Sequence, residues 1–176
     1  MKTIKTYLLE INVNGEWKKA EVAPDETLLY VLRERFGHTE VKEGCGKGDC
    51  GACAVLLDGN AVNACLTFAL QAHGQKVVTV KGIGTTKKPH PLQESFVKHG
   101  AIQCGFCTAG MIVSAKALLD ENHRHTREEV KKAISGNLCR CTGYKKIVEA
   151  IEEASKKIRR MKSEARNPKS ETISKF

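Results

Sequence analysis

Eight cysteines in a chain of 176 residues constrain this sequence more than any other feature. Their spacing divides them into two groups of four, with the patterns C-x4-C-x2-C-x11-C and C-x2-C-x31-C-x1-C. The first group is Cys45, Cys50, Cys53 and Cys65, and the second is Cys104, Cys107, Cys139 and Cys141. One 2Fe–2S cluster needs four thiolates, and C-x4-C-x2-C is the spacing of plant-type ferredoxins. The sequence therefore predicts two 2Fe–2S clusters with these two sets of ligands.

The segment that carries the first three cysteines, GCGKGDCGAC at residues 44–53, is rich in glycine. Glycine adopts positive φ at no steric cost, so such a loop can wrap closely around an inorganic core. Its successive backbone N–H groups can then point at the sulfur atoms and stabilise their negative charge. Gly46, Gly48 and Gly51 also match the dinucleotide-binding pattern G-x-G-x-x-G, which needs a preceding strand and a following helix. Because these glycines lie among the cysteines, a cluster loop explains them better.

A structural zinc site is the alternative metal centre. Zinc sites use pairs of cysteines in two matched halves, and three thiols between Cys45 and Cys53 fit that arrangement poorly. Four disulfides would need an oxidising compartment. A Rieske centre would need two histidine ligands, and no histidine replaces a cysteine in either group. Zinc and disulfides remain the alternatives to the clusters.

The first 81 residues have the pattern of an α+β domain. Asn14-Gly15 and Asp58-Gly59 are hairpin signals between runs of β-forming residues. A helix is expected from a cap at Asp25 or Thr27 to Phe36, and a second one over 65–72. The predicted strands cover residues 3–13, 17–22, 54–57, 61–62 and 76–80.

Beyond a polar linker at 82–91, the sequence has helical patterns only. Thr126 and Glu129 form a capping-box signal, and Thr108 is a candidate cap for the helix after Cys107. Four helices in so short a segment predict a small all-α bundle over 92–160. Residues 161–176 are predicted to be a basic, flexible tail. The predicted helices cover residues 92–98, 108–119, 126–134 and 144–158.

Charge and hydropathy exclude several classes of protein. The net charge is +9, but residues 156–176 contribute +6 of it and the rest of the chain only +3. The body has no basic stripe with interleaved aromatic residues, so nucleic-acid binding is not expected. The longest apolar stretch, from Ala109 to Leu119, is too short to span a membrane. No signal peptide fits the N-terminus, which favours the cytoplasm and reduced thiols.

The segments GCGKGDCGAC, QCGFCTAGM at 103–111 and GNLCRCTGY at 136–144 resemble the iron–sulfur small subunits of the molybdenum hydroxylases. This family includes xanthine dehydrogenase, aerobic-type carbon monoxide dehydrogenase and aldehyde oxidoreductase. The resemblance covers about residues 3–155. Ala109 stands where the family commonly has proline, and Asp49 where it commonly has glutamate. Neither difference removes a ligand.

The resemblance implies a β-grasp, ferredoxin-like domain holding the first cluster and a four-helix bundle holding the second. It also implies a large partner subunit with a molybdopterin cofactor, contacted by Gln103 and lying closest to Cys141. Electrons would pass from molybdenum through the second cluster and then the first, usually to FAD on a medium subunit. This chain would transfer electrons without a substrate site of its own, so we expect no catalytic residue in it. The alternative is a stand-alone two-cluster ferredoxin that acts as a diffusible electron carrier.

Overall fold

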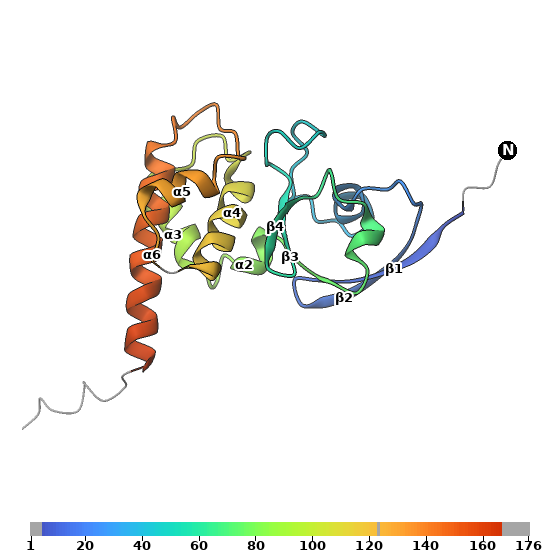
Figure 1. Ribbon diagram of the computed structural model, residues 1–176, viewed down its shortest axis with the longest axis horizontal. Helices are drawn as coiled ribbons and strands as arrows, with labels where there is room; N and C mark the ends of the chain where they lie inside the picture. The colour runs from blue at the N-terminus through green and yellow to red at the C-terminus, as the bar shows by residue number, and fades with distance from the viewer. Residues whose placement is uncertain (1–4, 123, 167–176) are drawn as a thin grey trace, which may run out of the picture.

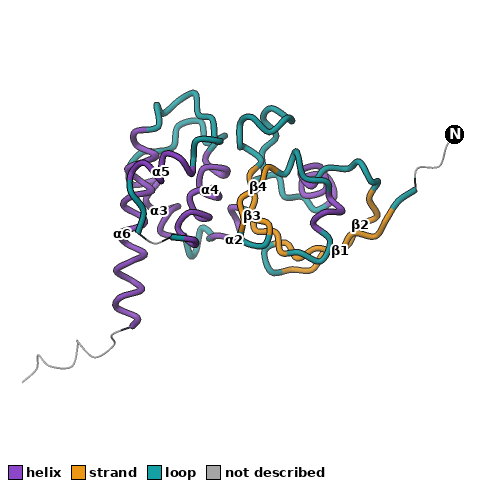
Figure 2. Tube along the Cα trace, in the orientation of Figure 1, coloured by secondary structure: helices purple, strands orange, loops and turns teal. Residues whose placement is uncertain are grey.

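The computed structural model describes residues 5–122 and 124–166. Two domains lie side by side, a twisted sheet with short helical turns and a bundle of helices (Figure 1). The loops that carry the cysteines lie at the same end of the two domains, at the top of the view in Figures 1 and 2. The predicted order, an α+β domain followed by an all-α domain, is confirmed.

The sheet is mixed and has five strands in the order β2-β1-β5-β3-β4. β1 and β5 run parallel at its centre, and the other neighbours pair antiparallel, which is the β-grasp arrangement. Asn14 and Gly15 both have positive φ and close the first hairpin, as their sequence predicts. The strands are β1 (Tyr7–Val13), β2 (Glu16–Val22), β3 (Ala54–Leu57), β4 (Asn60–Asn63) and β5 (Lys76–Val78).

The helix expected after Pro24 begins at α1 (Leu28–Tyr30) and continues as a π-helical turn, Val31–Arg35. Thr27 is its cap, because its hydroxyl accepts a hydrogen bond from the Tyr30 N–H at 3.2 Å. The helix expected over 65–72 is helical only at Ala69–Ala72.

The reason for this difference is tertiary hydrogen bonding. The carbonyl of Thr67 accepts from the Leu28 N–H at 2.7 Å, and the Ala69 N–H donates to the Glu26 carbonyl at 2.9 Å. The backbone before Ala69 therefore pairs with the segment that leads into α1, and it cannot close helical turns of its own.

Four helices form the bundle of the second domain, as expected. Each packs on its neighbours around a core that includes Phe96, Met111 and Ile151. Thr126 and Glu129 form the predicted capping box. None of the helices in the described part of the chain is long and apolar enough to cross a membrane. The helices are α3 (Pro91–Lys98), α4 (Thr108–Glu121), α5 (Arg127–Ala133) and α6 (Lys145–Arg166).

The helical segments differ from the expected ones in three places. A single turn, α2 (Val80–Ile83), reaches into the predicted linker, where Val80 and Ile83 pack on the bundle core. Thr108 is the first residue of α4, so Cys107 and not Thr108 occupies the cap position. α6 continues to Arg166 and projects beyond the bundle (Figure 1), because its Lys, Arg, Met, Glu and Ala residues are strong helix formers. The rest of the predicted tail, 167–176, lies outside the described residues.

A buried polar cluster joins the two domains beside the apolar contact of Leu56 with Val113. Thr79, fully buried, caps α2, and its hydroxyl donates to Glu40 Oε1 at 2.8 Å. Lys81 Nζ forms an ion pair with Glu40 Oε2 at 3.0 Å. Burial acts to raise the pKa of Glu40, but backbone and side-chain hydrogen bonds outweigh it and lower the pKa to about 2.

We expect Glu40→Gln to lower the free energy of unfolding by about 1–2 kcal/mol at pH 7. The lowered pKa means that Glu40 stabilises the fold fully above its ordinary pKa of 4.5, and that this contribution is lost as pH falls toward about 2. The difference between the two proteins should therefore shrink below pH 5. Urea unfolding at pH 7, 5 and 4 checks it, with the exposed Glu16→Gln as control. A difference that stays constant with pH would contradict the role of the charge.

Candidate metal centres

The first group of cysteines lies on the loop before β3 and directly after β4. Cys53 and Cys65 are buried, whereas Cys45 and Cys50 are partly exposed. The loop is irregular and leads into a strand, so the helix that a dinucleotide site requires is missing from this described segment. Gly46, Gly48 and Gly51 take positive φ, and a Cβ on Gly48 would lie 2.4 Å from the Leu66 side chain. The loop therefore folds over the thiols as its composition predicts.

The thiols of the first group interact in pairs. Cys50 is close enough to Cys45 to affect the pKa of the Cys45 thiol, and Cys65 affects that of Cys53 in the same way. Backbone N–H groups of Lys47 and Cys50 donate to the Cys45 sulfur, the first at 3.5 Å, and lower the pKa of Cys45 to about 7. Burial raises the pKa of Cys53 to about 12. Backbone N–H groups thus stabilise negative charge on the outer thiol, while the inner thiol needs a metal to displace its proton.

The second group comes from two loops of the helical domain. Cys104 and Cys107 lie in the turn that leads into α4, and Cys139 and Cys141 lie in the loop between α5 and α6. Cys104 and Cys141 are exposed and their sulfurs are 3.6 Å apart. Cys107 and Cys139 are less exposed, and Cys139 is close enough to Cys107 to raise the pKa of its thiol. This group therefore has an outer pair and an inner pair of thiols.

The two thiols of the inner pair, Cys107 and Cys139, differ in pKa. Burial raises the pKa of Cys107 to about 12, and the neighbouring Cys139 thiol adds to the effect. Burial also acts to raise the pKa of Cys139, but hydrogen bonds from the Thr142 hydroxyl and from the backbone outweigh it and lower the pKa to about 7. The Cys139 sulfur lies 3.2 Å from Thr142 Oγ1. The loop before α6 thus supplies donors for a negatively charged sulfur.

Pairs of thiols are what a binuclear cluster requires, because each of its two irons binds two cysteines. Two thiolates about 2.3 Å from one tetrahedral metal lie roughly 3.8 Å apart, close to the 3.6 Å between the Cys104 and Cys141 sulfurs. Among the described residues, no three Cys, His, Asp or Glu side chains are close enough to hold one ion. A zinc site needs four ligands on a single ion. The arrangement therefore fits a 2Fe–2S cluster better than zinc.

Gln103 lies beside the outer pair of the second group. Its side-chain Nε2 donates a hydrogen bond to the carbonyl of Cys141 at 3.1 Å. The exposed apolar side chains of Ile102, Phe106 and Leu138 belong to the same two loops. Gln103 therefore joins the two loops of this centre, and it does so at the surface where its thiols are exposed.

The structure adds two residues that the analysis of the sequence missed. Tyr144, expected only as the start of a helix, has a φ of +67°. Its hydroxyl accepts from the Cys139 N–H at 2.8 Å and donates to the Asn137 carbonyl at 3.3 Å. The Leu138 N–H donates to the Cys50 carbonyl at 2.9 Å and so connects the two cysteine loops. Tyr144 and Leu138 both belong to the segment GNLCRCTGY, but the spacing of its cysteines does not predict these three hydrogen bonds.

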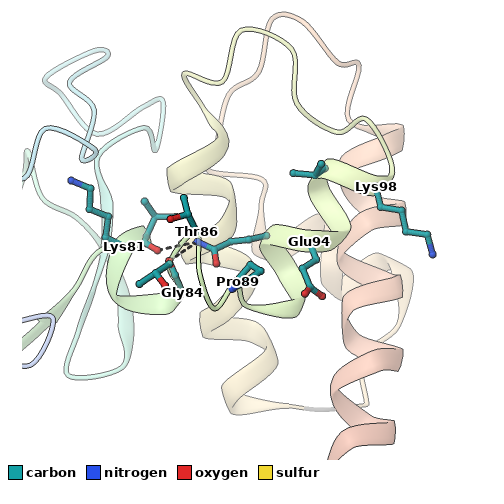
Figure 3. Close-up of a pocket in the computed structure, with 10 residues that line it drawn as sticks. Lys81, Gly84, Thr86, Pro89, Glu94 and Lys98 are labelled. Atoms are coloured by element: carbon teal, nitrogen blue, oxygen red, sulfur yellow. Dashed lines mark hydrogen bonds between the residues drawn. The ribbon is translucent and has the colours of Figure 1, made fainter.

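A groove of about 810 Å³ is lined by residues of α2, the linker and α3 (Figure 3). Its labelled residues include Gly84, Pro89 and Glu94, and Gln93 Nε2 donates to the Gly84 carbonyl at 2.9 Å across it. No cysteine lines this groove. The two groups of thiols, and not the groove, are therefore the candidate functional sites.

Comparisons with known proteins agree with this geometry. Residues 11–76 match the model of the 2Fe-2S iron-sulfur cluster binding domain, and residues 79–152 match that of the [2Fe-2S] binding domain. The nicotinate dehydrogenase small FeS subunit of Eubacterium barkeri is 49% identical over 83% of this chain and 93% of its own length. The chain belongs to the iron–sulfur small subunits of the molybdenum hydroxylases. The predicted resemblance is thereby confirmed.

Solved structures support the same family. The crystal structure of quinoline 2-oxidoreductase from Pseudomonas putida 86 matches with a TM-score of 0.83 and 43% identity over 88% of this chain and 97% of that chain. The aldehyde oxidoreductase of Megalodesulfovibrio gigas is 46% identical over 88% of this chain, which spans only 17% of that protein. A small-subunit sequence thus also occurs within a longer chain. Relatives named as small subunits of dehydrogenases confirm the prediction of an oxidoreductase subunit over that of a stand-alone ferredoxin.

Proposed function

We propose that this chain holds two 2Fe–2S clusters and relays electrons between partner subunits of a molybdenum-dependent dehydrogenase. The observation that carries the proposal is the arrangement of the eight thiols in two sets of pairs, on loops that touch each other. Each cluster, when bound, accepts and donates one electron. The ligands of the first cluster are Cys45, Cys50, Cys53 and Cys65, and those of the second are Cys104, Cys107, Cys139 and Cys141.

The exposed pair of thiols indicates where electrons enter. Cys104 and Cys141 lie at the surface among exposed apolar side chains, which suits a face that a large subunit covers. We propose that Gln103 and Cys141 contact the molybdopterin cofactor of that subunit. The hydrogen bond from Gln103 to the Cys141 carbonyl supports this role, because it holds both residues at the same surface.

The first centre is the proposed exit. Its partly exposed thiols, Cys45 and Cys50, would face an FAD-binding medium subunit, and the exposed Leu66 and Phe68 lie on the segment that holds Cys65. We also place the complex in the cytoplasm, because all eight cysteines are free thiols rather than disulfides, which suits a reducing compartment. The division into domains at the linker 82–91 stays a prediction. The chain itself supplies no substrate site in this proposal.

Anaerobic purification of the chain with the proteins encoded beside it tests the proposal. We expect iron and labile sulfide in equal amounts, two reduced-cluster EPR signals after dithionite, and coelution with a large subunit. The reason is that the thiols must be deprotonated on the irons to give a stable centre. Zinc without sulfide would contradict the clusters. A chain that carries both clusters but elutes alone would favour the diffusible carrier.

A further inference from the structure

Asn137 is a buried polar side chain that the proposed function does not use. It is 3% exposed and lies two residues before Cys139, between the two cysteine loops. Its Nδ2 donates a hydrogen bond to the Gly51 carbonyl at 3.0 Å, across 86 positions of the chain. A buried polar group is costly unless it is paired. The hydrogen bond to Gly51 therefore satisfies the buried Asn137 amide with a partner from the other domain.

The backbones of the two loops touch at the same place. The Leu138 N–H donates to the Cys50 carbonyl at 2.9 Å. A Cβ on Gly51 would lie 2.4 Å from the Gly136 carbonyl oxygen and 2.5 Å from Asn137 Nδ2. A side chain at position 51 would therefore not fit, and we call this contact, formed by Cys50, Gly51, Asn137 and Leu138, the loop junction.

The backbone of Asn137 also forms a hydrogen bond within its own domain. The Tyr144 hydroxyl donates to its carbonyl at 3.3 Å and accepts from the Cys139 N–H at 2.8 Å. The backbone of Asn137 is thus fixed to the loop of the second centre, while its side chain is fixed to the loop of the first. Any shift of one loop relative to the other must break one of these hydrogen bonds.

We propose that Asn137 is a positioning residue that sets the distance and orientation between the two clusters. The inference rests on the proposed function, since it concerns electron transfer between them. In that step the second cluster is oxidised by one electron and the first is reduced by one, with no bond formed and no proton moved. The rate of electron tunnelling falls exponentially with distance, so a small opening of the loop junction slows the step.

Asn137→Asp tests the inference, because it keeps the size of the side chain and replaces the donor with an acceptor that faces the Gly51 carbonyl. The matched control is Asn63→Asp. Asn63 Nδ2 donates to the Gly48 carbonyl at 2.9 Å, so it holds the same loop but from within the first domain. Asn137→Ser is a second, uncharged variant that is too short to reach Gly51.

The measurements are iron and sulfide content and the low-temperature EPR spectrum of the reduced chain, in which two nearby paramagnetic clusters split each other's signals. We expect both Asn137 variants to keep their iron and lose part or all of the splitting, while Asn63→Asp retains it. Full splitting in both Asn137 variants, or equal loss in the control, would overturn the inference. Loss of the second cluster from both variants would overturn it too, since Asn137 would then only maintain the loop. A wild-type chain without iron and sulfide would instead refute the proposed function.

Discussion

Replacing Cys107 with serine should remove half of the iron, half of the labile sulfide and one of the two EPR signals of the reduced chain. Cys107 is partly buried and faces Cys139, and burial raises its pKa to about 12. Only a metal can keep such a thiol deprotonated. A serine hydroxyl is a still weaker acid and a harder ligand, so the second cluster should be lost while the first remains.

Cys53→Ser is the reciprocal variant. Cys53 is the buried thiol of the first group, paired with Cys65, and burial likewise raises its pKa to about 12. We expect this variant to lose the other EPR signal and to keep the one that Cys107→Ser removes. Each domain has its own apolar core, so neither substitution should unfold the partner domain. A variant of either kind that retained both signals and its full visible spectrum would contradict the assignment of four ligands to each cluster.

The irregular, glycine-rich loop around the first three cysteines could be predicted because it depends on neighbouring residues. Three of the proposed ligands of the first group lie within nine residues, and the glycines between them have the positive φ that the loop needs. The hairpin turns at Asn14-Gly15 and Asp58-Gly59 could likewise be predicted, because each depends on two adjacent residues that adopt positive φ. These turns account for the pairing of β1 with β2 and of β3 with β4, whereas the insertion of β5 between β1 and β3 is a non-local pairing.

The contacts between distant segments could not be predicted in this way. Residues 65–68 have helical composition, but they pair with the segment before α1 because that hydrogen bonding satisfies their backbone. The hydrogen bond from Asn137 to Gly51 joins positions 86 residues apart, and nothing in the spacing of either motif specifies it. The sequence motifs therefore indicate the proposed ligands, whereas the relative position of the two loops depends on tertiary packing.

Gly110 in α4 shows how strongly this packing constrains the sequence, and Gly110→Ala should lower the free energy of unfolding by about 2 kcal/mol or more. Helix propensity alone predicts the opposite, a gain of about 1 kcal/mol. However, a Cβ on Gly110 would lie 2.1 Å from the Gly51 carbonyl oxygen. That oxygen is backbone and already accepts the Asn137 hydrogen bond, so it cannot move aside without opening the loop junction.

Gly136→Ala is the control for Gly110→Ala, because a Cβ on Gly136 meets no atom within 4 Å and its φ is not positive. We expect it to change the free energy of unfolding by less than about 0.5 kcal/mol. Urea unfolding followed by circular dichroism compares the two variants, and the EPR splitting reports whether the loops have separated. If Gly110→Ala were as stable as the wild type, α4 and the Gly51 loop could not be in the close contact described here. Since this contact buries both the Gly51 carbonyl and the Asn137 amide, loss of stability and loss of splitting should occur together.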